Sequence, residues 1–310
     1  MTDFFIATIE DPDGVTSAVV HDGSVHAVPG RPAVAALLGD WEAQLARLRD
    51  DLEAGRLAEP RKLADVKLLT PVPDPPNLYL VGGNYADHAR EMQKLGPDVP
   101  VPRAVEGPLV FLKPRLALSG PGDPIVMPPG YERLDWEAEL AVVIGRRAYK
   151  VPVADARSYV AGYTVANDVS VRDAFRRSSD LDPPLAWDWF LHKGWVGSCP
   201  VGPWIVPAGP GFDPENAPLG LTVNGEVMQS SNTSEMLFSA DEIIAFISNV
   251  VPLLPGDIIA TGTCAGVGMG RGRYLKDGDE VVAEVGRIGK LSNDVVTAAQ
   301  AARLPALAGA

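Results

Sequence analysis

The most constraining feature of the sequence is a strand-like run that carries two glutamates into an apolar segment. LDWEAEL, residues 134–140, continues directly into AVVIG. In a strand, Glu137 and Glu139 would share one face, about 7 Å apart at their Cα atoms. Residues 141–144 are apolar on both faces, which predicts burial on both sides. Two ionised carboxylates in such a place repel each other and lose hydration, which costs free energy. Exposure to solvent, pairing with Lys or Arg, or a bound cation must offset this cost.

A second apolar strand ends in another acid. YVAGYTVANDVSVRD, residues 159–173, reads as a strand that stops at Asn167-Asp168. A carboxylate cluster favours a hard cation with oxygen ligands, such as Mg²⁺, Mn²⁺ or Ca²⁺. The four histidines and two cysteines show no zinc-ligand spacing. Arg146 and Arg147 lie beyond the first apolar run and are poorly placed to pair with the two glutamates.

Short apolar runs between Gly and Pro turns predict a mainly β chain with a minority of helix, an α+β fold. Residues 1–70 predict a small N-terminal α/β domain with strands in FFIATI, SAVV and SVHAV and one amphipathic helix over 33–55. Residues 71–77 form a proline-rich linker, 78–303 a larger domain and 304–310 a flexible tail. Asn224-Gly225 predicts a type I′ hairpin turn, and Ser239 with Glu242 predicts a helix capping box.

The bulk composition excludes several classes of partner. A formal net charge of −13 argues against nucleic acid or an anionic membrane as the main partner. No apolar run approaches the roughly 20 residues that cross a bilayer. The N-terminus lacks the basic region of a secretory signal, and two cysteines are too few for a disulfide framework, so we expect a cytoplasmic protein.

Five separated motifs resemble the fumarylacetoacetate hydrolase family: GGNYADHAREM, LDWEAELAVVIG, VAGYTVANDVSVRD, SNTSEMLFSADEIIAFIS and LLPGDIIATGTCAGVG. The similarity extends from about residue 78 to about residue 296, in the family's order. The resemblance implies a mixed β-roll catalytic domain behind a small N-terminal domain, and a homodimer. It also implies a divalent metal, Mg²⁺ or alternatively Mn²⁺ or Ca²⁺, held by Glu137, Glu139 and Asp168.

The same resemblance assigns catalytic roles to three further residues. His88 and Glu91 are three residues apart, so they are neighbours on a helix face. On spacing alone they read as an incidental surface pair, but the resemblance implies a water-activating dyad, with the loop over residues 92–108 as a lid. Lys193 would stabilise enolate or oxyanion charge. The residues after it, Gly194 to Val196, depart from the family pattern, which has an aspartate at the third position.

Three residues are expected to bind the substrate: Tyr85, Arg172 and Thr263. Arg172 reads equally well as a carboxylate anchor or as the ion-pair partner of Asp173 or another acid. Phe175 stands where some family members have a substrate-binding glutamine, so we expect a more apolar end of the pocket. The glycine-rich run at 260–272 lacks a phosphate-loop pattern. Cys264 has no base motif beside it, which favours a cavity-wall residue over a nucleophile.

The predicted function is therefore that of a metal-dependent enzyme acting on a small 1,3-dioxo or 2-oxo acid through an enolate. Hydrolysis of a C–C bond in an acylpyruvate-like or fumarylacetoacetate-like compound is favoured. Decarboxylase, isomerase and hydratase activities are alternatives on the same site, because all of them share the electrophilic groups. A non-catalytic oxo-acid-binding protein is a further alternative, and the presence of His88, Glu91 and Lys193 disfavours it.

Overall fold

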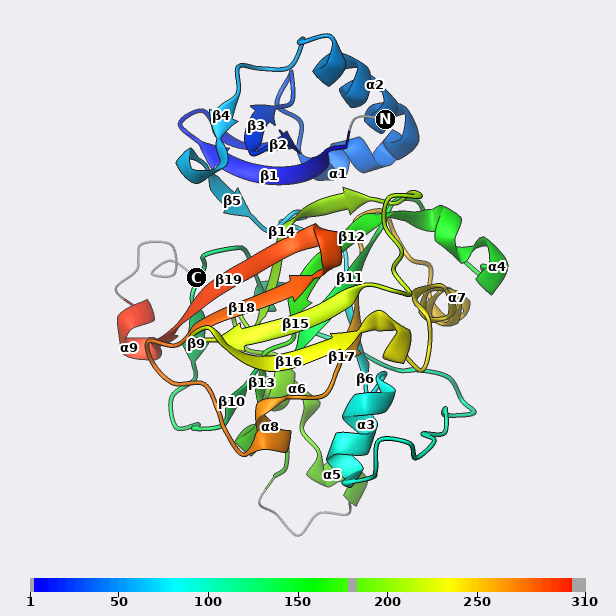
Figure 1. Cartoon of the computed structure of the whole chain (residues 1–310), viewed down its shortest axis with the longest axis vertical. Coiled ribbons are helices and arrows are strands. Elements are labelled where there is room, and N and C mark those ends of the chain that lie inside the picture. The colour runs from blue at the N-terminus through cyan, green and yellow to red at the C-terminus, as the bar shows by residue number, and fades with distance from the viewer. Residues whose placement is uncertain (1–2, 178–182, 303–310) are drawn as a thin grey trace.

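The computed structural model describes residues 3–177 and 183–302 of the chain (Figure 1). The predicted tail at 304–310 lies outside these residues. Strands dominate, and helices are mostly short, which confirms the predicted mainly β fold with minority helix. No helix in the described ranges is long and apolar enough to cross a membrane.

Of the five N-terminal strands, the first three lie where the sequence predicts them, and the last two were not predicted. The five are β1 (Phe5–Asp11), β2 (Gly14–His21), β3 (Ser24–Ala27), β4 (Arg61–Lys62) and β5 (Lys67–Leu69). β1 also pairs with β14 (Cys199–Pro207), with Ile6 opposite Ile205, so these strands extend the main sheet of the rest of the chain. No helix or strand lies between β5 and β6 (Leu78–Gly82), as the proline-rich linker predicts. The domain boundaries themselves stay a prediction.

The helix predicted over 33–55 is divided into three, so its predicted continuity is wrong. It forms α1 (Val34–Leu37), a 3₁₀ turn η1 (Leu38–Asp40) and α2 (Trp41–Glu53). Asp40 leaves helical geometry at φ −146° and ψ 61°. This turn lets the buried Trp41 indole donate a 2.7 Å hydrogen bond to the Ala161 carbonyl. A tertiary contact thus outweighs the local helical pattern.

The main sheet has the order β4-β3-β2-β1-β14-β12-β11-β17-β6-β7. Its remaining members are β7 (Leu109–Leu112), β11 (Ala138–Ile144), β12 (Val160–Asn167) and β17 (Ile258–Thr263), and β8 (Leu118–Ser119) pairs with β14. Every residue of β11 and β12 is buried, which confirms the burial expected from their apolar runs. These two strands are central in the sheet and are therefore held on both edges.

A five-stranded sheet packs beside the main one. Its order is β16 (Glu226–Asn232), β15 (Pro218–Val223), β18 (Glu280–Val285), β19 (Gly289–Thr297) and β9 (Ile125–Met127). β10 (Leu134–Asp135) and β13 (Ser170–Val171) form a two-stranded ladder. Asn224 at φ 52° and Gly225 at φ 77° confirm the predicted type I′ turn between β15 and β16.

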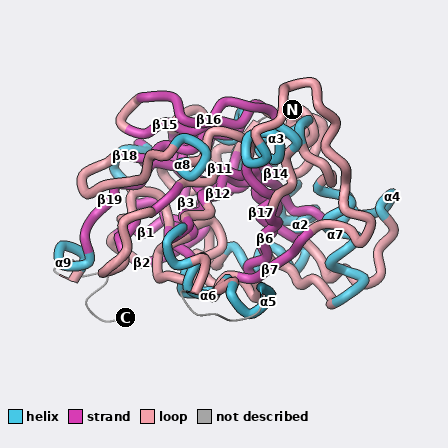
Figure 2. Tube along the Cα trace, turned by 90° about the horizontal axis from the view of Figure 1, so that it is seen from below, coloured by secondary structure: helices cyan, strands magenta, loops and turns pink. Residues whose placement is uncertain are grey.

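Helices α3, α5, α6 and α8 lie at the lower end of the molecule in Figure 1, and Figure 2 looks onto this end. The helices are α3 (Ala86–Gln93), α4 (Val153–Ala156), α5 (Pro183–Ala186), α6 (Trp189–Lys193), α7 (Ala240–Val250), α8 (Gly268–Arg271) and α9 (Ala298–Ala301). Further 3₁₀ turns are η2 (Leu63–Asp65), η3 (Arg115–Ala117), η4 (Arg157–Tyr159), η5 (Arg172–Ala174), η6 (Thr233–Glu235) and η7 (Gly286–Ile288). The predicted capping box of Ser239 and Glu242 starts α7.

Candidate active site

Strand register brings the three predicted metal ligands together. Ala138 of β11 lies opposite Asn167 of β12, so the residues that flank this pair, Glu137 and Asp168, meet at one end of the ladder. The Asp168 amide donates to the Glu137 carbonyl at 2.9 Å. One carboxylate oxygen from each of Glu137, Glu139 and Asp168 lies within 4.8 Å of the other two, and all three residues are buried.

Basic side chains relieve part of this negative charge. Lys193, at the end of α6, donates to Glu137 Oε2 at 2.8 Å and to Asp168 Oδ2 at 2.5 Å. Arg172 donates to Glu137 Oε1 at 2.5 Å. Burial alone would raise the pKa of Glu137, but the charges of Lys193 and Arg172 hold it below its usual range. Pairing with Lys or Arg is one of the three ways of offsetting buried negative charge that the sequence analysis considered. It neutralises the charge of Glu137 and part of the charge of Asp168.

Sequence reasoning missed Lys113, which also reaches this cluster. Its ammonium lies 2.6 Å from Asp168 Oδ1 and donates to the carbonyls of Val169 (2.9 Å) and Ser198 (2.5 Å). Lys113 directly follows β7 and is buried. Its only sequence signal was a single lysine after the apolar run LVFL, which is also typical of a surface lysine at a strand end.

Glu139 differs from the other two acids. It accepts a 2.7 Å hydrogen bond from the Gly262 amide, and no basic side chain among the described residues forms a hydrogen bond or ion pair with it. Burial, followed by the charges of Asp168 and Glu137, raises the pKa of Glu139 well above its usual value. Both carboxylate oxygens of Asp168 have a lysine partner, Oδ1 with Lys113 and Oδ2 with Lys193, so Glu139 is the acid of the three without a cationic partner among the described residues. An all-oxygen donor set with an uncompensated acid fits a hard divalent cation.

The predicted dyad lies on one face of α3. His88 Nδ1 is 3.4 Å from Glu91 Oε2, and both carboxylate oxygens of Glu91 accept from the Gly266 amide at 3.0 Å. Burial works against ionisation of Glu91, but hydrogen bonds from His88 and Gly266 lower its pKa below the usual value. A Cβ on Gly270 would lie 2.5 Å from Glu91 Cδ, so a glycine there lets α8 approach the carboxylate. The glycine-rich run thus positions the dyad.

A cavity of about 110 Å³ joins these groups. Six of the predicted site residues line it: His88, Glu137, Asp168, Arg172, Lys193 and Thr263. The Thr263 hydroxyl donates to the Ala138 carbonyl and accepts from Gln229, both at 2.8 Å, so only one acceptor position remains for a ligand. Glu139 and Glu91 are not among the residues that line the cavity.

Two predicted residues lie away from the cavity surface. Tyr85 is fully buried in the core and is not among the lining residues. Cys264 is also fully buried, and burial raises the pKa of its thiol far above the usual value. A thiol that stays protonated at neutral pH is a poor nucleophile, as expected from the sequence. Cys264 is not among the lining residues, so it does not occupy the cavity-wall position that the sequence predicted.

Arg172 is held by acids other than Asp173. Its Nε donates to Asp135 Oδ2 at 2.7 Å, in addition to its bond with Glu137. Asp135 also accepts from the amides of Gly268 (2.5 Å) and Met269 (3.0 Å) at the start of α8. Arg172 still lines the cavity, so it is both an ion-pair partner and a candidate substrate anchor.

Part of the cavity lining is aromatic and contains a histidine that the sequence did not single out. Phe175 lies 4.3 Å from the His192 ring and 5.2 Å from Trp189, centroid to centroid. His192 Nδ1 is 3.0 Å from the Val171 carbonyl, and Nε2 is 3.5 Å from Arg172 Nη1. Burial, then the charges of Lys193 and Arg172, lowers the pKa of His192 to about 3. A neutral imidazole that donates through Nδ1 has a bare Nε2, which faces Arg172.

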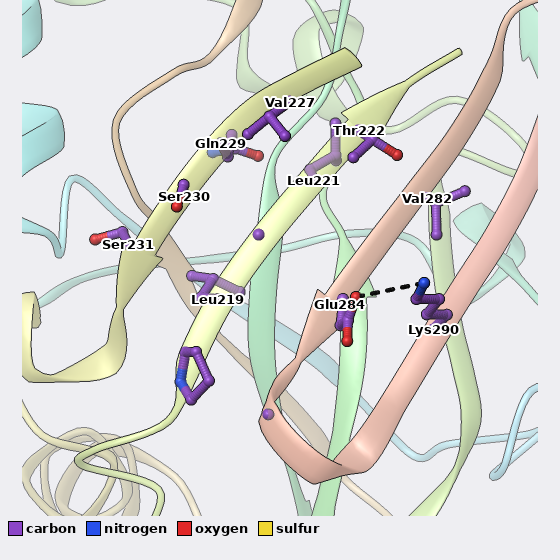
Figure 3. Close-up of a pocket in the computed structure, with 13 residues that line it drawn as sticks. Leu219, Leu221, Thr222, Val227, Gln229, Ser230, Ser231, Val282, Glu284 and Lys290 are labelled. Atoms are coloured by element: carbon purple, nitrogen blue, oxygen red, sulfur yellow. Dashed lines mark ion pairs between the residues drawn. The ribbon is translucent and has the colours of Figure 1, made fainter. Parts of the chain in front are cut away.

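A different hollow, of about 380 Å³, lies on the five-stranded sheet (Figure 3). Its walls come from β15, β16, β18 and β19, and its charged pair is Glu284 and Lys290, 3.9 Å apart. It contains none of the predicted catalytic or metal-binding residues. The smaller cavity is therefore the candidate active site because of its chemistry.

Comparison with known proteins shows a family for most of the chain. The family described as fumarylacetoacetate (FAA) hydrolase C-terminal matches residues 77–296. Oxaloacetate tautomerase FAHD2A, mitochondrial, of Bos taurus is 43% identical over 261 residues, which are 84% of this chain and 78% of that protein.

Two solved structures extend the similarity to most of the fold. The 2-hydroxyhepta-2,4-diene-1,7-dioate isomerase of Mycobacterium marinum is 33% identical, with a TM-score of 0.73 over 95% of this chain and 99% of that chain. Maleylpyruvate hydrolase of Sphingobium sp. SYK-6 is 31% identical, with a TM-score of 0.75 over 94% of this chain and 99% of that chain.

Proposed function

Because the chain belongs to the fumarylacetoacetate hydrolase family, we propose that it is a divalent-metal-dependent enzyme that hydrolyses a C–C bond in a small acylpyruvate. One observation carries this proposal: a single cavity is lined by His88 of the dyad and by the buried cluster of Glu137, Asp168 and Lys193. A base and an enolate-stabilising group therefore face the same small volume. The solved hydrolase relative, named for maleylpyruvate, supports the same reaction class.

The residues divide the reaction between them. His88, held by Glu91, accepts a proton from water, and the resulting hydroxide attacks the distal acyl carbonyl of the substrate. The C–C bond between that carbonyl carbon and the methylene then breaks, and its electron pair becomes the pyruvate enolate. Lys193 stabilises the enolate oxygen by its positive charge. The proton taken by His88 returns to the enolate carbon, so the products are a carboxylic acid and pyruvate.

The remaining polar groups bind and orient the substrate. A divalent cation held by Glu137, Glu139 and Asp168 would act as a Lewis acid towards the 2-oxo acid end of the substrate. Arg172 presents its guanidinium to the cavity and would pair with the substrate carboxylate. His192 accepts from Arg172 through Nε2 and so limits the rotation of the guanidinium.

Tautomerisation of a 2-oxo acid is the second candidate function. It needs the same enolate stabilisation and a proton shuttle, which His88 supplies without attack by water. The bovine relative, named as an oxaloacetate tautomerase and 43% identical, favours this alternative.

Two assays on the purified protein with Mg²⁺ separate these reactions. We expect acetylpyruvate to be consumed with equal amounts of acetate and pyruvate, measured by coupled pyruvate reduction. Enol-to-keto conversion of oxaloacetate, followed by ultraviolet absorbance, tests the second function. Tautomerisation without any pyruvate release from acylpyruvates would overturn the hydrolase proposal. Lys193→Met should slow whichever reaction occurs, because both pass through the enolate.

Three accompanying proposals concern the assembly, the location and the metal ion of the protein. We propose a homodimer, which light scattering coupled to size-exclusion chromatography tests directly. A cytoplasmic location stays a prediction from the composition, and fractionation of the source cells tests it. Mg²⁺ is the proposed ion, with Mn²⁺ and Ca²⁺ as alternatives, and calorimetric titration with each ion ranks them.

A further inference from the structure

A second recess, here called the side chamber, adjoins the candidate active site. It has a volume of about 460 Å³ and is lined by residues from α3, from the loop at 101–109 and from the segment at 237–246. Gly82 and Gly83 line both the side chamber and the catalytic cavity. The two spaces therefore meet at the end of β6.

The side chains of Leu109 and Trp189 border this junction beside Gly82, but the space beside Gly83 is free of them. A Cβ placed on Gly83 would meet no heavy atom within 4 Å, so the space beside it is open. Consecutive residues of α3 divide between the two spaces: His88 lines the catalytic cavity, and Ala89 lines the side chamber. A molecule whose reacting carbon lies at His88 can therefore extend past Ala89 into the chamber.

The walls of the side chamber are mainly apolar. Its large lining side chains are Val101, Leu109, Leu237, Phe238 and Phe246. No lysine or arginine is among its lining residues, and the single acid is Glu106. A carboxylate in this space would lose hydration, lack a cationic partner and be repelled by Glu106.

Two basic side chains near the chamber are already paired with acids, Arg90 with Glu235 and Arg103 with Glu242. Arg103 donates to Glu242 at 2.6 Å, and its guanidinium lies 4.4 Å from the centre of the Phe238 ring. These contacts tie the loop at 101–109 to the start of α7. The loop thus forms a wall of the chamber while its positive charge is neutralised outside the lining.

We propose that the side chamber binds the distal group of the substrate, and that this group is an uncharged alkyl or alkenyl chain and not a second carboxylate. This inference rests on the proposed function, because it places the 2-oxo acid end at Arg172 and Lys193. It narrows the substrate class to acylpyruvates with an apolar acyl tail. Contact with apolar walls should increase affinity about two- to fourfold for each added methylene.

Binding of unreactive 2-oxo acids tests the chamber independently of turnover. The probes are 2-oxobutanoate, 2-oxohexanoate and 2-oxooctanoate, with 2-oxosuberate as an acid-terminated compound of the same length as the last. Calorimetry with Mg²⁺-loaded protein should show affinity rising along the series, and 2-oxooctanoate binding at least about tenfold more tightly than 2-oxosuberate. Equal affinity along the series, or tighter binding of the dicarboxylate, would overturn the proposal.

A filling variant and a matched control locate the effect. Ala104→Phe adds a ring to the loop that lines the chamber and should reduce 2-oxooctanoate affinity about tenfold while leaving 2-oxobutanoate unchanged. Val227→Phe adds a similar ring to the exposed face of the five-stranded sheet and should change neither. Equal loss for both ligands in Ala104→Phe would contradict a distal subsite. Failure of acylpyruvate hydrolysis with retained length dependence would reject the proposed reaction and keep the chamber.

Discussion

The two walls of the active-site cavity are built differently. On one side, Glu137 and Asp168 lie at the ends of central strands, are almost fully buried, and are held by Lys193, Arg172 and Lys113. On the other side, His88 and Glu91 lie on the eight-residue helix α3, with side chains 14% and 22% exposed. The mostly exposed loop at 94–108 follows this helix.

This difference suggests a division of labour. The acids that hold a cation and the lysine that stabilises an enolate must keep their positions during the reaction. Strands that are paired at both edges provide this, because the surrounding structure does not relax. A proton carrier must exchange with water and admit the substrate, which a partly exposed helix beside a loop allows. The strand wall should therefore control metal binding, and the helix wall should control turnover without affecting the metal.

Asp168→Asn is the strongest test of the strand wall. Removing this carboxylate should weaken Mg²⁺ binding and lower kcat/KM together, by about a thousandfold or more, because it leaves Lys113 and Lys193 without their shared acid. Calorimetry and the coupled assay measure the two effects. Asp173→Asn, at an exposed position nearby, is the control and should retain both. Wild-type metal affinity in Asp168→Asn would remove this residue from the ligand set.

His88→Ala tests the helix wall. We expect kcat to fall about a hundredfold or more because the base is lost, while the dissociation constant for Mg²⁺ changes by less than about threefold. His26→Ala, in the N-terminal strand β3, should behave as the wild type. If His88→Ala weakened metal binding as much as turnover, the two walls would not be independent.

His192 lies on the strand side and provides a pH-dependent test. Its pKa is lowered to about 3 in the folded protein, first by burial, so an unfolded chain with an ordinary histidine pKa of about 6.5 takes up a proton first as the pH falls. The folded protein therefore loses stability progressively below pH 6.5, by about 2 kcal/mol at pH 5 from this group. In urea unfolding at pH 7 and pH 5, His192→Gln should show a correspondingly smaller loss. An unchanged loss would mean that His192 is protonated in the fold.

Glu91→Gln should give the smallest effect. The amide keeps the size of the side chain but cannot stabilise a protonated His88, so kcat should fall about tenfold with no change in metal affinity. The pKa of Glu91 is lowered in the fold, so the carboxylate stays ionised until the pH falls below its usual range. A pH profile should show that the variant is impaired at neutral pH and converges with the wild type in acid.

The local sequence pattern was sufficient to predict a structural element where the residues that determine that element lie close together in the sequence. The alternation around Glu137 and Glu139, the Asn224-Gly225 turn and the capping box before α7 each depend on a few neighbouring residues, and the structure contains the corresponding elements. The helix at 33–55 is the instructive exception, because the Trp41 contact with Ala161 spans 120 positions and overrides the local preference.

Residue chemistry and family motifs in the sequence determined the acids, the dyad and the lysine that the candidate site contains. Only the tertiary structure decided their environment. Lys113 reaches Asp168 across 55 residues of chain, and His192 is neutral because burial and two neighbouring cations disfavour its charge. The side chamber likewise brings residues 82–109 together with residues 237–246, which lie more than a hundred positions later in the chain. Charge pairing, desolvation and cavity shape depend on distances that are set only when remote segments pack together, so no local pattern contains them.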